Sequence, residues 1–177
     1  MIRVDIEFYI EESKVIEGVY LLTPTISRDI RGSIWTSFLK KDVERLLPDG
    51  FYFKHDKFST SKHNVLRGIH SDTKSWKLVT CVSGEIQQVV VDLRKKSKTY
   101  LDWQDFLISD ANQKMILIPP HIGNAYYVVS DQAVYHYKLA YQGGYIDADK
   151  QISTKWNDKR IGISWLTKHP ILSERDQ

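Results

Sequence analysis

The chain has 177 residues and a formal net charge of +3, with 42% hydrophobic and 27% charged residues, as in ordinary globular proteins. Basic and acidic residues alternate along the chain, which disfavours a nucleic-acid-binding protein, because such proteins gather Lys and Arg on one face. A single cysteine excludes an intrachain disulfide, and no apolar stretch approaches the roughly 20 residues of a membrane span. We therefore expect one cytoplasmic domain over residues 1–177, without a membrane segment.

Short apolar or alternating runs recur along the chain. They span residues 18–23, 33–38, 51–58, 65–69, 77–82, 86–93, 103–108, 114–118, 125–129 and 133–140. Turn signals such as Ser83-Gly84 and Pro119-Pro120 separate them. Only residues 42–47 are expected to be helical, and Pro48 ends that helix. Many short strands at this spacing predict an all-β sandwich or barrel.

The run over residues 86–93 contains the polar side chains of Gln87, Gln88 and Asp92. A plain sandwich core needs no polar residues there. One face of this strand is expected to line a polar cavity or, equally, to meet solvent, since antiparallel sheets are often wet on one side.

Six histidines are candidates for chemistry, but no His-x-His pair followed by Glu occurs, and a single cysteine excludes zinc sites built from Cys and His. We therefore expect no catalytic metal. His70 differs from the others because it closes the string VLRGIH at the end of a predicted strand. Arg67 and His70 are three residues apart and would face opposite sides of a regular strand, so Gly68 is a candidate β-bulge that brings both to one site.

Other kinds of chemistry find little support. The chain has no Gly-x-Ser-x-Gly elbow and no phosphate-binding glycine loop, and Cys81 lies in an apolar run typical of a core residue. The string YHYKLAY, over residues 135–141, is compatible with ordinary aromatic packing in a half-buried strand. It is equally compatible with a tyrosine that acts as a general acid.

Six strings, in the same order along the chain, resemble the dTDP-4-dehydrorhamnose 3,5-epimerase family. They are VLRGIH, KLVTCVSGEIQQVVVDLRKKSKTY, IPPHIGNAYYVVS, YHYKLAY, WNDKRIGISW and PILSERD. The resemblance runs from about residue 18 to residue 176. It implies an all-β, cupin-like jelly-roll β-barrel with few short helices, usually a homodimer, that uses no metal or organic cofactor. The family's substrates are nucleotide-diphosphate 4-keto sugars.

The resemblance also implies roles for individual residues. His70 matches the family's catalytic histidine, Tyr137 its catalytic tyrosine, and Lys77 the lysine of its KLV motif. Asp158, in WNDKR, is the expected partner of the histidine, and Arg67 is expected near the substrate. A histidine that titrates near neutral pH suits the removal of a proton beside a ketone. A lysine suits stabilisation of the enolate, and a tyrosine across the sugar ring suits its reprotonation.

Three departures from the family pattern concern the surroundings of this set. Asn124 replaces the family's second active-site histidine, the string RGSIWT alters the N-terminal motif associated with the nucleotide, and His55 and Lys57 replace a Gln and an Asn. The strings RGSIWT, FKHDKF, PPHIGN and YKLAY look closer to the branch that acts on GDP-linked 4-keto-heptoses in bacterial capsule synthesis. We therefore expect an epimerase of that branch.

The expected substrate-binding residues follow from charge and position. Arg67 and Lys57 are candidates for the diphosphate, with Arg31 contributed by the other subunit, because cations and above all the guanidinium fork suit phosphate. Asn124 and His55 are expected near the sugar. The alternatives are a dTDP-4-dehydrorhamnose 3,5-epimerase proper, a nucleotide-sugar 3,4-ketoisomerase and a non-catalytic sugar-binding module.

Overall fold

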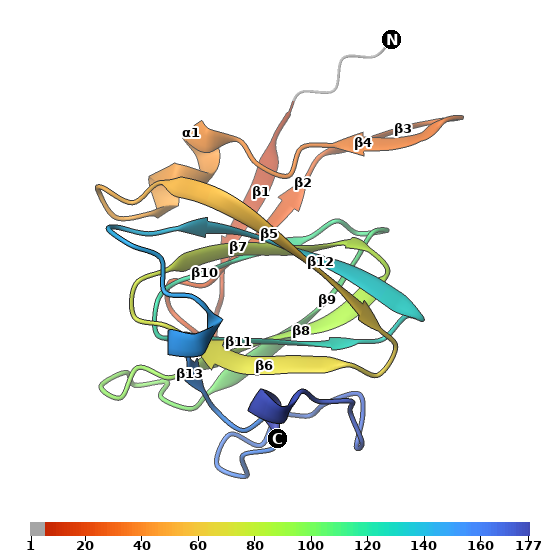
Figure 1. Cartoon of the computed structure of the whole chain (residues 1–177). Helices are drawn as coiled ribbons and strands as arrows, with labels where there is room; N and C mark the ends of the chain where they lie inside the picture. The colour runs from red at the N-terminus through yellow and green to blue at the C-terminus, as the bar shows by residue number, and fades with distance from the viewer. Residues whose placement is uncertain (1–5) are drawn as a thin grey trace.

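Two antiparallel sheets face each other in the computed structural model, which describes residues 6–177 (Figure 1). The six-stranded sheet has the order β1 (Phe8–Glu12), β2 (Tyr20–Pro24), β10 (Met115–Ile118), β7 (Trp76–Ser83), β12 (Gln132–Ala140) and β5 (Phe53–Lys62). The five-stranded sheet has the order β13 (Ile152–Ser153), β6 (Leu66–Ser71), β11 (Ile122–Val128), β8 (Glu85–Asp92) and β9 (Trp103–Ser109). From β5 to β13 the chain alternates between the two sheets, except that β8 and β9 are neighbours in the same sheet, and this topology confirms the predicted cupin-like jelly roll.

The remaining elements are short. A two-stranded hairpin, β3 (Ile26–Asp29) and β4 (Gly32–Trp35), projects away from the two sheets (Figure 1). The helical segments are α1 (Lys40–Val43) and the 3-10 turns η1 (Glu44–Leu46), η2 (Ala148–Lys150) and η3 (Glu174–Asp176). No helix within residues 6–177 is long and apolar enough to cross a membrane.

The main core lies between the two sheets. It contains Val79 and Cys81 of β7, Val90 of β8 and Val128 of β11, all of which are completely buried. Burial at about 25 cal/mol per Å² of apolar surface is the main force that holds the sheets together. Strand β5 alternates between half-buried and exposed residues, as expected for an edge strand with one wet face.

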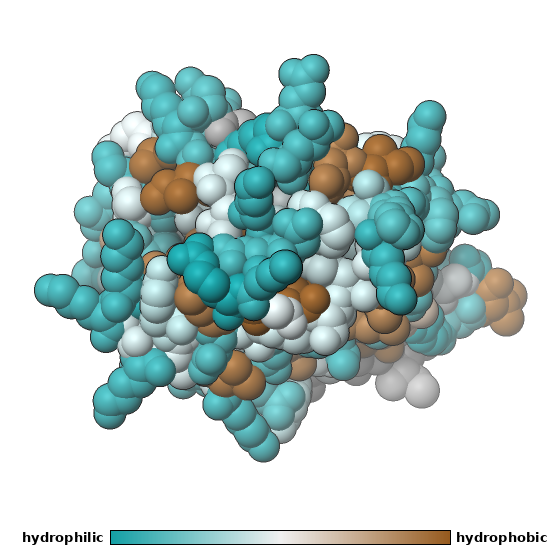
Figure 2. All heavy atoms as spheres, turned by 90° about the horizontal axis from the view of Figure 1, so that it is seen from below, coloured by the Kyte–Doolittle hydropathy of each residue, from teal (hydrophilic) through white to brown (hydrophobic). Residues whose placement is uncertain are grey.

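The C-terminal segment covers the outer face of the five-stranded sheet, where Ile161 and Trp165 pack against Val89 and Val91 (Figure 1). Figure 2, which views the molecule from below, shows that hydrophilic side chains cover most of this face of the protein. The cover explains why β8 is buried on both faces although its sheet is antiparallel.

Gln87, Gln88 and Asp92 of β8 are all buried, so none of them meets solvent. Gln87 points outward beneath the C-terminal segment, where its side chain bonds the backbone of Ser164 and Leu166. Gln88 points inward and bonds the side chains of Asn124 and Tyr135. Gln88 does not itself line the cavity between the sheets, but it bonds two residues that do, Asn124 and Tyr135. Gln87 fastens the covering segment.

The structure differs from the sequence-based prediction at a few elements. The strands β1 and β13 were not anticipated, because acidic residues flank and end the short apolar stretch of β1 and because β13 has only two residues. Of the run over residues 33–38, only residues 33–35 form a strand, in the β3–β4 hairpin, whose first strand lacks a clear apolar pattern. The helix begins two residues earlier than predicted, and its second half is a 3-10 turn that ends before Pro48.

Candidate active site

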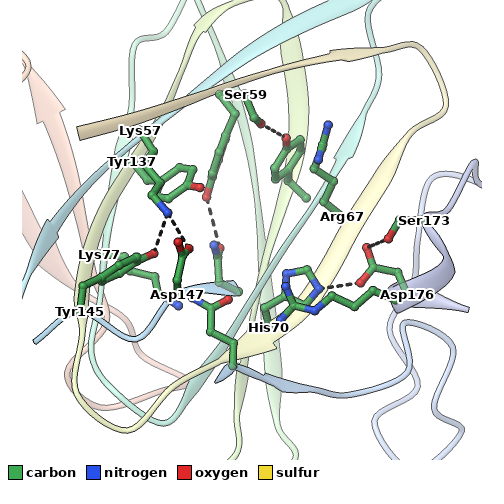
Figure 3. Close-up of a pocket in the computed structure, with 15 residues that line it drawn as sticks. Lys57, Ser59, Arg67, His70, Lys77, Tyr137, Tyr145, Asp147, Ser173 and Asp176 are labelled. Atoms are coloured by element: carbon green, nitrogen blue, oxygen red, sulfur yellow. Dashed lines mark hydrogen bonds and ion pairs between the residues drawn. The ribbon is translucent and has the colours of Figure 1, made fainter. Parts of the chain in front are cut away.

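A cavity of about 310 Å³ opens between the two sheets, and each sheet supplies one wall (Figure 3). On the six-stranded sheet, Lys57 of β5 pairs with Tyr137 of β12, and Tyr137 in turn pairs with Val79 of β7. Residues directly opposite each other in an antiparallel pair share a face. This row therefore points Lys57 and Tyr137 inward, and Lys77 of β7 lies one row further along the same face.

On the five-stranded sheet, His70 and Arg67 of β6 both line the cavity. His70 pairs with Asn124 of β11 and Arg67 pairs with Tyr126, so three steps along β6 match two steps along β11. This extra residue turns an odd spacing into a shared face, which confirms the bulge predicted at Gly68.

Only glycine fits at this bulge. Gly68 has a φ of +124°, and a Cβ at its position would lie 2.5 Å from the Cβ of Ala125. A real Cβ contact of that length would force backbone movement. The glycine of VLRGIH is therefore a requirement of the close approach between β6 and β11, and this approach presents His70 to the cavity.

The carboxylate partner of His70 is Asp176, in η3, with the imidazole Nε2 2.6 Å from Asp176 Oδ1 (Figure 3). The other carboxylate oxygen accepts hydrogen bonds from the hydroxyl of Ser173 and the backbone N–H of Gly68. Burial alone would raise the pKa of Asp176, but the bonds from His70 and Ser173 outweigh it and the pKa is lowered. An ionised carboxylate only accepts, so we assign the imidazole proton to Nε2, which leaves Nδ1 as the basic nitrogen.

The prediction that Asp158 partners His70 is wrong. Asp158 pairs with Arg160 at 2.6 Å, and this hydrogen bond holds the pKa of Asp158 at about 2. It borders a separate surface hollow formed by the C-terminal segment. The two candidates could not be separated by chain position, since only the fold brings η3 beside β6.

Burial shifts the pKa values of Tyr137 and Lys77 in opposite directions, and a neighbouring charge opposes each shift. Burial raises the pKa of the Tyr137 phenol, although nearby Lys57 opposes the shift, so the phenol keeps its proton at neutral pH. Lys77 is 5% exposed and lies 3.3 Å from the buried carboxylate of Asp72. Burial lowers the pKa of Lys77, and Asp72 counteracts this by favouring the charged ammonium.

The expected binding residues fall into two groups. Lys57 lines the cavity and bonds Asp147 at 2.7 Å and the hydroxyl of Tyr145 at 3.3 Å (Figure 3). His55 faces the same way but lies beyond the cavity, against Tyr145 and bonded to the Tyr141 hydroxyl. Arg31 lies at the tip of the β3–β4 hairpin, paired with Asp29, and does not line the cavity of its own chain.

Sequence reasoning missed several residues of the cavity. Arg175 and Asp176 both belong to PILSERD, one of the strings that carried the resemblance, so a signal existed but gave no role. Tyr145 and Asp147 lie in a segment without apolar periodicity, and no sequence signal pointed to them. In the described residues, 6–177, no group of three or more His, Cys, Asp or Glu could hold a metal ion.

The family model for dTDP-4-dehydrorhamnose 3,5-epimerase matches residues 13–177. The chain belongs to this family. It is 34% identical over 165 residues to the dTDP-4-dehydrorhamnose 3,5-epimerase of Salmonella typhimurium, covering 91% of this chain and 88% of the relative. It is 31% identical to the dTDP-4-dehydrorhamnose 3-epimerase of Streptomyces niveus, covering 92% and 78%.

Solved structures of family members share the fold. The epimerase of Legionella pneumophila, in complex with dTDP-4-keto-L-rhamnose, has a TM-score of 0.88 and 31% identity, covering 96% of this chain and 90% of that one. The 4-keto-6-deoxy sugar epimerase NovW of Streptomyces spheroides has a TM-score of 0.87 and 28% identity, covering 96% and 85%. These relatives confirm an isomerase-type enzyme of nucleotide sugars. The expected GDP-linked heptose gains no support from them, because the substrates they name are dTDP-linked.

Proposed function

We propose that this epimerase inverts carbon 3, carbon 5 or both of a dTDP-linked 4-keto sugar, with His70 as the base and Tyr137 as the acid. The observation that carries the proposal is that the two side chains line one cavity from opposite sheets. Inversion requires a proton to leave one face of the carbon and another to arrive at the opposite face. A base and an acid on facing walls, with the sugar ring between them, meet that requirement.

The steps follow from the contacts of each group. His70 Nδ1 takes the proton from the carbon beside the ketone, and Asp176 stabilises the imidazolium that forms. The electron pair moves onto the keto oxygen, where the Lys77 ammonium stabilises the enolate. Tyr137 then delivers its phenolic proton to the opposite face of the carbon. The protons are afterwards exchanged with solvent, which restores neutral His70 and Tyr137.

The cations around the cavity suit a diphosphate. Arg67 and Arg175 line it, and each uses its Nε to bond a serine of the protein, Ser61 and Ser153 respectively. Within residues 6–177 no hydrogen bond uses their terminal nitrogens, which suit the forked recognition of phosphate. Lys57 supplies a third cation once its carboxylate partner, Asp147, yields to the substrate.

A GDP-linked 4-keto sugar is the second candidate substrate. It is favoured by two departures from the family pattern, one on or beside the Lys57 wall and one in the projecting β3–β4 hairpin. His55 and Lys57 stand where the family has a Gln and an Asn, and the RGSIWT string changes the N-terminal motif. The core of the site, His70 with Lys77 and Tyr137, serves either nucleotide.

We also propose that the chain forms a homodimer through the outer face of the six-stranded sheet. Phe58 of β5 is 65% exposed there, and Ile34 of the projecting hairpin is 74% exposed. An isolated two-stranded hairpin is marginally stable in water, so packing against a second copy would stabilise it. Arg31 at the hairpin tip would then be carried toward the partner. Light scattering of the parent and of Phe58→Lys tests this, and a monomeric parent contradicts it.

The experiment for the activity is solvent deuterium exchange. The protein is incubated in heavy water with dTDP-linked and with GDP-linked 4-keto-6-deoxy sugars, and exchange at carbons 3 and 5 is followed by mass spectrometry. We expect His70→Asn to abolish exchange and Tyr137→Phe to retain it while altering the stereochemistry at carbon 5. Product NMR separates epimerisation from 3,4-ketoisomerisation. Parental exchange in His70→Asn, or none in the parent with either nucleotide, would overturn the proposal.

A further inference from the structure

The side-chain amide of Gln88 has only one possible orientation. Its Nε2 lies 3.1 Å from the carbonyl oxygen of Val89 and 3.0 Å from that of Ala125. Two carbonyl oxygens can only accept, so the atom between them must be the amide nitrogen. The amide oxygen of Gln88 then accepts the hydroxyl proton of Tyr135 at 2.9 Å, with both side chains buried.

This orientation fixes the amide of Asn124 in turn. Gln88 Nε2 also lies 2.6 Å from the Asn124 amide, and a donor there requires Asn124 to offer its oxygen. The Tyr135 hydroxyl approaches the same oxygen at 3.3 Å. The two N–H groups of Gln88 are shared among three acceptor oxygens, and a flipped Asn124 would place its amide nitrogen 2.6 Å from that of Gln88, where neither nitrogen can accept. The Asn124 NH₂ group therefore points away from Gln88, and no hydrogen bond within residues 6–177 uses it.

Asn124, which carries this unused NH₂ group, lies beside His70, the proposed base. Asn124 lines the cavity and is the direct cross-strand partner of His70, so the Cβ atoms of the two residues are about 5 Å apart on one wall. The keto oxygen is two bonds from the carbon that loses its proton to the base. A donor adjacent to the base is thus within reach of the oxygen on which charge develops.

We propose that Asn124 is a catalytic residue, a pre-oriented neutral donor to the keto oxygen that becomes the enolate oxygen. Gln88 is its positioning residue, anchored by two backbone carbonyls. The inference rests on the proposed function and deepens it, because it gives the enolate a second donor beside Lys77. No bond to hydrogen breaks at Asn124, since a carboxamide donates without titrating. Its contribution does not change with pH.

The relative exchange rates of two variants distinguish a donor to the enolate from a purely structural residue. Asn124→Asp keeps the oxygen that bonds Gln88 and Tyr135 but replaces the cavity-facing donor by a negatively charged oxygen. Asn124→Ala loses the bonds to Gln88 and Tyr135 but adds no charge. A donor to the enolate predicts that Asn124→Asp is the slower enzyme, because its carboxylate repels the enolate. A structural role predicts the reverse.

We expect Asn124→Ala to lower kcat for exchange by about 100- to 1000-fold with little change in KM, as for other oxyanion donors. Asn124→Asp should be slower still. Titration with dTDP counts the folded sites in each variant, so that rates refer to folded protein. Faster exchange in Asn124→Asp than in Asn124→Ala, or a change confined to KM, would overturn the inference. A parent that exchanges no 4-keto sugar would instead overturn the proposed function.

Discussion

Replacing Asp176 by asparagine should disable the proposed base while leaving it in place. In the parent, Asp176 Oδ2 accepts from the Ser173 hydroxyl at 3.1 Å and from the backbone N–H of Gly68 at 3.5 Å. The backbone N–H can only donate, so it favours the amide oxygen at this position. The amide NH₂ then faces His70 Nε2, and the imidazole proton must move to Nδ1, the nitrogen that we propose as the base.

The magnitude follows from the lost interaction. A hydrogen bond to a charged group contributes about 1.5–3 kcal/mol, and each 1.36 kcal/mol of barrier is a factor of about ten in rate. The Asp176–His70 bond is short, at 2.6 Å, and the Asp176 side chain is 3% exposed, so solvent screening is small. Asp176→Asn should therefore slow proton abstraction by about 10- to 150-fold.

The assay is deuterium exchange into the 4-keto sugar under single-turnover conditions, which reports the base step without product release. Asp158→Asn is the matched control, because Asp158 pairs with Arg160 outside the cavity. It should exchange at the parental rate. Thermal unfolding of both variants establishes that each is folded at the assay temperature.

Two results would refute this reasoning about the base. Exchange at the parental rate in folded Asp176→Asn would mean that His70 does not depend on this carboxylate. A large loss in Asp158→Asn, with Asp176→Asn unaffected, would restore the partner first expected from the sequence. Each result identifies a different error, since the first concerns the tautomer and the second the placement of η3.

Three further predictions concern ionisable groups away from that pair. Bonds from Arg94 and Thr99 outweigh burial and lower the pKa of Asp92 from 3.8 to about 2, so the folded state gains about 2 kcal/mol above the unfolded pKa and loses it as pH falls. Urea unfolding should show Asp92→Asn less stable at pH 7, with the gap closing between about pH 4 and pH 2. Asp72→Asn should lower the pKa of Lys77 further, because burial then acts unopposed. The alkaline limb of the pH profile of exchange should then move to lower pH. A limb that does not move would mean that Asp72 does not control the ionisation of Lys77 during exchange. Burial raises the pKa of Cys81 to about 11, so iodoacetamide should modify the native protein at pH 8 far more slowly than the unfolded chain.

Much of the fold could be predicted from apolar periodicity, because most strands bury one regular face. The central strands β7, β10, β11 and β12 were each anticipated within a few residues. The failures were elements whose stability comes from tertiary contact. Acidic residues flank and end the short apolar stretch of β1, and the strand forms because β2 offers it a full row of backbone partners. Local sequence carries no record of such a partner.

The site could be predicted in part, for a similar reason. The spacing of Arg67 and His70 is incompatible with a shared face on a regular strand, and Gly68 between them was sufficient to predict the bulge from sequence alone. The carboxylate partner could not be chosen this way. Asp158 and Asp176 both follow the last long strand in coil-rich sequence, and only the docking of η3 beside β6 distinguishes them.

His70 and Tyr137 are carried by different sheets, so no single turn or hairpin fixes the gap between them. The gap is a spacing held by core side chains such as Val79 and Val90, which interlock the two layers. Small separations of the two sheets would leave each group intact yet admit water to the proposed enolate, and water can protonate either face. The stereochemical purity of the product would then depend on core packing. Substitutions that loosen the core would yield mixed stereoisomers before they abolish activity.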